Sequence, residues 1–126
     1  HILEPYKGKL VLLDVWGTWC VPCKMALAHS KEEFERLAPY DVVYLYMASS
    51  SPEESWKNII KLNNLVGDNI AHYNLPAAQQ RAIENYLNIH SFPSYRLFDK
   101  EGNLVDVKVD ARQLDNLEKI IKELNR

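Results

Sequence analysis

The sequence has few of the residue types that build metal centres or disulfide frameworks, and it has no long apolar run. Its 126 residues include only two cysteines and four histidines, and no two of the histidines are spaced as a ligand pair, whereas a structural zinc site needs four ligands. The formal net charge of −2 argues against a general affinity for nucleic acid. No apolar run approaches the roughly 18 residues of a membrane-spanning helix, and no glycine-rich loop could cradle a phosphate. We therefore expect no cofactor, no metal and no nucleic-acid partner.

The distribution of apolar residues predicts one domain of the α/β class. Strands are expected at residues 9–16, 41–47, 94–98 and 104–109, with an ambiguous short one at 70–75, and helices at 23–37, 52–66, 76–87 and 111–124. The first two strands are nearly continuous apolar runs, which is typical of central parallel strands. Residues 99–103 are expected to form the turn of a late antiparallel hairpin. We therefore predict a mixed central sheet with helices on both faces.

Local signals predict where the helices begin and which side chains they bury. Ser51 is expected to cap the second helix, because a serine followed by proline and two glutamates is typical of a helix start. Val66 is expected to belong to the apolar stripe of that helix, and Tyr86 to face inward from the next one. Glu33 lies in a charged run at residues 31–36, which we interpret as a solvated helix face.

The two cysteines, Cys20 and Cys23, lie between a buried strand and a helix. A bridge between them would close a very small loop and add little stability, so stability is a poor reason for the pair. A position at the start of a helix favours a thiolate, so Cys20 is expected to be the accessible, attacking thiol. Cys23, one turn into the helix, is expected to be less exposed and to resolve mixed disulfides. A half zinc site and an inert bridge are the less favoured alternatives.

The segment VLLDVWGTWCVPCK, at residues 11–24, resembles the active-site region of the thioredoxin superfamily. Residues 89–95 resemble the loop before the cis-proline of that family, and residues 99–102 resemble its hairpin turn. The extra stretch at about residues 49–80 resembles the helical insertion of the TlpA-like branch, which comprises thiol–disulfide oxidoreductases of the cell envelope. Many members of that branch carry Glu and Pro where this chain has Ala26 and Ala28, so the usual cause of a kink in this helix is missing.

The resemblance implies roles for further residues. Asp14 is expected to lie beneath Cys23 and to accept its proton during resolution; the alternative is a buried carboxylate satisfied by its surroundings. Pro93 is expected to follow a cis peptide bond, with the Phe92 backbone beside Cys20 and able to pair with an extended substrate segment. Trp19 is expected to form a flat apolar docking surface around Cys20 together with Val21, Pro22 and Phe92.

These observations predict a thioredoxin-like domain over residues 1–126 that exchanges disulfides with protein substrates, with the reducing direction favoured. The resemblance implies that it is the C-terminal part of a longer exported protein of the cell envelope or periplasm, that any membrane anchor lies outside the chain, and that a membrane-bound or soluble protein donates electrons. The domain itself is expected to be monomeric. Two alternatives stay open: a redox-inactive binding domain of a larger envelope protein, and a fold-related thiol peroxidase, whose usual Pro and Thr positions are held here by Leu13 and Gly17.

Overall fold

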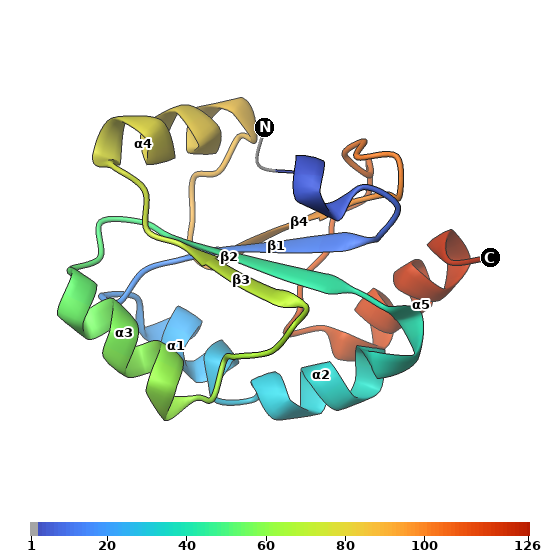
Figure 1. Cartoon of the computed structure of the whole chain (residues 1–126), viewed down its shortest axis with the longest axis horizontal. Coiled ribbons are helices and arrows are strands. Elements are labelled where there is room, and N and C mark those ends of the chain that lie inside the picture. Colours follow the sequence, from blue (N-terminus) through green and yellow to red (C-terminus); the bar gives the residue numbers. More distant parts are fainter. Residues whose placement is uncertain (1–2) are drawn as a thin grey trace.

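A four-stranded mixed sheet lies at the centre of the computed structural model, which describes residues 3–126 (Figure 1). The strand order is β3-β2-β1-β4. Strand β1 (Val11–Trp16) pairs in parallel with β2 (Val43–Ala48) and antiparallel with β4 (Ser94–Phe98). Strand β3 (Ile70–Tyr73) extends the sheet in parallel beyond β2. The predicted α/β class and mixed sheet are therefore confirmed, and the ambiguous segment at 70–75 contains a strand.

Helices cover both faces of this sheet (Figure 1). In chain order they are α1 (Val21–Leu27), α2 (Ser30–Leu37), α3 (Glu53–Leu62), α4 (Ala77–Tyr86) and α5 (Leu114–Leu124), with short 3₁₀ turns at Glu4–Tyr6 and Ala38–Tyr40. Helix α4 packs against one face, and the other four helices pack against the opposite face. Every residue of β1 and β2 is buried, as expected for strands that are covered on both sides.

The alternation of side chains along β1 divides the interior into two apolar clusters. Leu12 and Trp16 join the cluster beneath α1, α2, α3 and α5, whereas Val11, Leu13 and Val15 join the cluster beneath α4. Successive strand residues point to opposite faces, so Asp14 lies on the same face as Leu12 and Trp16. The only carboxylate of this strand therefore points toward the helices that follow the cysteine pair.

The predicted continuous helix over residues 23–37 is wrong, because α1 ends at Leu27 and α2 begins at Ser30. The interruption needs no proline. The His29 amide bonds to the Ala26 carbonyl at 3.0 Å, which is the tighter i→i−3 pattern of a helix end, and His29 has φ −104° and ψ 11°, outside the helical region. The Glu33 amide then bonds to the His29 carbonyl and starts the helical pattern again.

The predicted strand at residues 104–109 is also wrong. The turn after β4 forms, but the returning segment makes only an isolated bridge between Phe98 and Leu104 and one further backbone bond, from the Val105 amide to the Leu97 carbonyl. Leu104 and Val107 stay about half exposed, so little apolar burial would hold this segment along the sheet. It leaves the sheet edge instead and leads to Arg112, close to α1 and α2.

The stretch at residues 49–80 contains α3, the edge strand β3 and the beginning of α4, so it is not purely helical. Two expectations for this stretch, and one for the later part of α4, are wrong in detail. Pro52, not Ser51, is the residue before the first turn of α3. Val66 lies beyond the end of that helix and is exposed, and Tyr86 is also exposed, because Ile83 and Leu87 are the residues that pack toward the sheet.

Candidate active site

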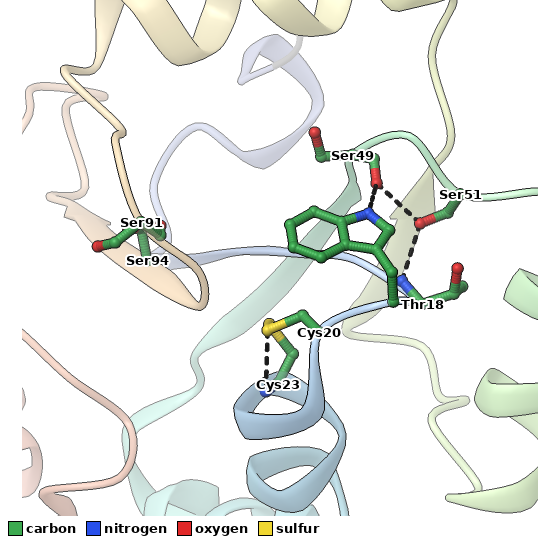
Figure 2. Close-up of a disulfide and its surroundings, with 8 residues drawn as sticks. Thr18, Cys20, Cys23, Ser49, Ser51, Ser91 and Ser94 are labelled. Atoms are coloured by element: carbon green, nitrogen blue, oxygen red, sulfur yellow. Dashed lines mark hydrogen bonds between the residues drawn. A yellow bond between two sulfur atoms is a disulfide. The ribbon is translucent and has the colours of Figure 1, made fainter.

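The chemistry of the candidate site is centred on a disulfide between Cys20 and Cys23, at the N-terminus of α1 (Figure 2). The two Cα atoms lie 5.3 Å apart. Cys20 is the N-cap residue of the helix, and its sulfur accepts a hydrogen bond from the Cys23 amide at 3.2 Å. Free amides and the helix dipole at this end stabilise negative charge, so the Cys20 sulfur occupies the position where a thiolate is favoured.

Both cysteines are more enclosed than the sequence predicts. Cys20 is 5% exposed and Cys23 is 1% exposed. The predicted order of exposure is confirmed, but the expectation that Cys20 is openly accessible is wrong for this disulfide form. The enclosure follows from the surrounding apolar residues, since both cysteines belong to the cluster that also contains Trp16 and Leu27, and Phe92 packs against this cluster.

A loop at residues 49–51 holds the segment before Cys20 in place (Figure 2). The Trp19 indole donates a hydrogen bond to the Ser49 carbonyl at 2.9 Å, and the Thr18 amide donates one to the Ser51 hydroxyl at 3.0 Å. The Ser51 hydroxyl in turn donates to the Ser49 carbonyl. The ring of Trp19 folds back so closely that a Cβ added at Gly17 would lie 2.5 Å from it, so a larger residue there would require the Trp19 ring to move.

The loop before β4 meets the cysteine segment through aromatic packing. The Phe92–Pro93 peptide bond is cis. The Phe92 and Trp19 rings pack edge to face with centroids 5.2 Å apart, an arrangement that aromatic quadrupoles favour. In the same loop, the Ser94 hydroxyl donates a hydrogen bond to the Ser91 carbonyl.

An apolar surface borders the disulfide. Trp19 is 53% exposed and Val21 is 60% exposed, Pro22 is exposed, and Phe92 is partly buried. Met25, one turn after Val21, is also exposed and extends this surface along α1. Of the residues expected to bind substrate, Pro93 differs, since its own side chain is buried.

Asp14 lies in a buried row of polar groups beneath the helices. In the sheet register its neighbours are Tyr46 on β2 and Tyr95 on β4. Asp14 is 9% exposed, and among residues 3–126 its Oδ1 has no hydrogen-bond partner, nor has the Tyr95 hydroxyl. Burial raises the pKa of Asp14 well above its usual value, the carboxylates of Glu33 and Asp110 raise it further, and Arg112 opposes them. These effects favour the protonated form of the Asp14 carboxyl.

Glu33 is the residue that the sequence interpretation placed wrongly. It lies on α2 beside inward-facing Ser30 and Leu37, and it is partly buried instead of solvated. Burial raises the pKa of Glu33 from 4.5 to about 7. The sequence contains a signal for this position, since residue 33 follows Ser30 by three and precedes Leu37 by four, but the surrounding charges concealed it.

Comparison with known proteins agrees with this geometry. A family profile described as Thioredoxin-like matches residues 8–104. The thiol-disulfide oxidoreductase ResA of Bacillus cereus is 25% identical over 124 residues, which cover 97% of this chain and 67% of that protein. The thioredoxin-like protein YneN of Bacillus subtilis is 27% identical over 123 residues, covering 92% of this chain and 65% of that protein.

Solved structures share the fold as well. The exposed lipoprotein thioredoxin Etrx1 of Streptococcus pneumoniae is 28% identical, with a TM-score of 0.72 over 97% of this chain and 90% of that one. The thioredoxin domain of a thiol-disulfide oxidoreductase from Bacteroides vulgatus is 21% identical, with a TM-score of 0.76 over 98% of this chain and 84% of that one. The family profile spans most of the present sequence, and the chain therefore belongs to the Thioredoxin-like family.

Proposed function

We propose that this chain is a thiol–disulfide oxidoreductase that reduces disulfides of protein substrates through Cys20 and Cys23. The observation that carries the proposal is the cysteine pair. The two cysteines form a disulfide, and the Cys20 sulfur lies at the N-terminus of α1, where it accepts a hydrogen bond from the Cys23 amide. A helix N-terminus lowers the pKa of a thiol, and the thiolate is the form that attacks disulfides. The names of the relatives support the same reaction class.

The reaction proceeds by two exchanges. In the reduced protein the Cys20 thiolate attacks one sulfur of a substrate disulfide, forms a mixed disulfide and releases the other substrate sulfur as a thiolate. Cys23 then loses its proton to Asp14, and its thiolate attacks the Cys20 sulfur. The Cys20–Cys23 bond forms, the bond to the substrate breaks, and the second substrate sulfur leaves as a thiolate. A thiol-bearing donor protein must then supply two electrons to reduce Cys20 and Cys23 again.

Substrates are proposed to dock on the apolar surface around the disulfide. Exposed aromatic and apolar side chains next to a nucleophile are well suited to bind an unfolded or extended segment. The residues proposed for this contact are Trp19, Val21, Pro22, Phe92 and Pro93, of which Phe92 is partly buried and Pro93 is buried. An extended substrate segment that pairs with the Phe92 backbone would bring its sulfur toward Cys20.

We also propose an extracytoplasmic setting for a monomeric domain that is the C-terminal part of a longer protein. The description of one structural neighbour as an exposed lipoprotein supports this setting, as does the fact that the chain spans about two thirds of the ResA relatives it matches. In the described part of the chain no helix is long and apolar enough to cross a membrane.

The test is to trap the mixed disulfide. Cys23→Ser should accumulate protein substrates bound to Cys20 through bonds that dithiothreitol releases, because the resolving thiol is missing. Cys20→Ser is the matched control and should trap none. Equal recovery from both variants would contradict the assigned roles, and a wild type unable to reduce any protein disulfide would favour an idle binding domain. Hydrogen peroxide consumed faster than protein disulfides would favour a peroxidase.

The reduction potential tests the direction. Equilibration in thiol buffers should give a value from about −200 to −270 mV or slightly lower, the range of glutaredoxins and thioredoxin. A value near about −120 mV would make the protein an oxidant. A bridge that resists reduction well below about −300 mV would indicate a structural disulfide.

A further inference from the structure

The proton that Asp14 accepts needs a route to solvent, and the structure contains one candidate. Asp14 is enclosed between two strands and the helices above it. A cavity of about 240 Å³ opens on the same side of the sheet, at the interruption between α1 and α2. Its walls include Ala26, His29 and Arg112. Glu33 also lines the cavity, and its charge acts on Asp14.

We propose that Glu33 is the solvent-side partner of Asp14: the proton that Cys23 gives to Asp14 passes to Glu33 and leaves through this cavity. This inference rests on the proposed function, because it concerns the resolution step of that reaction. The balance is simple. Cys23 loses one proton, Asp14 gains it and passes it to the ionised Glu33, and Glu33 releases it to water in the cavity. No electrons move in the relay.

Glu33 has the surroundings that such a role requires. It is partly buried, and the loss of solvation places its pKa at about 7, so it can both take up and release a proton near neutral pH. It acts electrostatically on Asp14 and also on Tyr95, so its charge is felt across the polar row. Because Glu33 touches neither sulfur in this scheme, it is a positioning residue that acts through Asp14.

The other charged and titratable groups around this path come from every packed element. They are Asp14 on β1, Tyr44 and Tyr46 on β2, Tyr95 on β4, His29 and Glu32 at the start of α2, and Asp110 with Arg112 before α5. Arg112 is held by the Asp110 carboxylate through two side-chain bonds. Its charge is therefore largely compensated. Among residues 3–126, Glu33 is the only carboxyl that both lines the cavity and acts on Asp14.

The experiment measures the rate of the resolution step alone. A mixed disulfide between Cys20 and a chromogenic thiol is prepared, and release of that thiol is followed from pH 5 to 9. In Glu33→Gln the plateau rate at high pH should fall about tenfold, a small part of what general acid–base groups contribute. The midpoint should also move to lower pH, because a like charge next to Asp14 has been removed. Glu35→Gln, an exposed position on the same helix, is the matched control and should leave both values unchanged.

A double variant distinguishes a proton route shared by Asp14 and Glu33 from two independent effects on the resolution rate. If the two carboxyls act in series, Glu33→Gln should cause no further slowing in an Asp14→Asn background. Added formate should restore much of the lost rate in Glu33→Ala, because the cavity can admit a small carboxylate, whereas chloride at equal ionic strength should not.

The outcomes distinguish the two proposals. A wild type that never resolves the mixed disulfide would refute the proposed function. A wild type that resolves it at the same plateau rate as Glu33→Gln would refute the relay alone, even with a shifted midpoint, since that shift requires only charge. Additive slowing in the double variant would likewise refute the relay.

Discussion

Replacing Glu33 with Gln is expected to stabilise the folded protein, and the gain is expected to grow with pH. The physical reason is that burial raises the pKa of Glu33 from 4.5 to about 7. Between these two values the folded state keeps a proton that the unfolded state has lost, so the free energy of unfolding falls as pH rises. Each pH unit costs about 1.4 kcal/mol, which gives a cost of at most about 3 kcal/mol above pH 7. Gln carries no charge and avoids this cost.

Urea unfolding of the disulfide form at pH 4, 6 and 8, followed by tryptophan fluorescence, measures this effect. The two proteins should be nearly equal in stability at pH 4, and Glu33→Gln should be the more stable at pH 8 by about 2–3 kcal/mol, somewhat below the limit because the side chain is not fully enclosed. Glu35→Gln should follow the wild type at every pH. Equal stability of Glu33→Gln and the wild type at pH 8 would show that the carboxylate is solvated and that the reasoning is wrong.

Two further predictions concern the packing of the fold. Leu117 on α5 is completely buried in the cluster that α5 covers, so Leu117→Ala should lower the free energy of unfolding by about 2–5 kcal/mol. Leu62→Ala, at an exposed position, is the control and should change it by less than about 0.5 kcal/mol. Similar losses for the two variants in urea denaturation would contradict the assigned core. Burial also lowers the pKa of His72, which stacks on Tyr46, so protonation opposes folding and stability should fall as pH drops below about 6.5. His72→Phe keeps an aromatic ring but cannot titrate, so a wild-type stability that does not decline relative to this variant between pH 7 and pH 5 would contradict the prediction.

Much of the fold could be predicted because strong apolar runs specify it. Strands β1 and β2 are buried on both faces and leave few alternatives. The strand predicted at residues 104–109 was wrong for the opposite reason. It alternates apolar and charged residues as a strand would, yet its Leu104 and Val107 find nothing to bury them, and strand propensity depends on such packing. The interruption at His29 also carries no sequence signal, since it depends on the tighter bond to Ala26.

Some residues of the candidate site could likewise be predicted from the sequence, and others could not. Cys20 and Cys23 could be located from sequence because their spacing and position before a helix identify the chemistry directly. Glu33 and Ser49 could not, because their importance depends on contacts between distant segments. Ser49 receives the Trp19 indole bond from thirty residues away, and Glu33 influences Asp14 from a different element. The spacing of Glu33 from Ser30 and Leu37 marks the inward side of this helix, but it does not encode that Asp14 lies within electrostatic reach.

Hydrogen bonds to the 49–51 loop make the stretch that follows β2 a structural support of the cysteine segment. Ser49 and Ser51 anchor Trp19 and Thr18 on one side, and on the other side the Ser51 carbonyl accepts a bond from the Asn74 side chain at 2.9 Å. A chimaera that exchanged this stretch for a short connection would therefore lose the anchor of the loop before Cys20 even though both cysteines remained. Domain grafts between relatives should therefore move residues 49–74 and the cysteine loop as one unit.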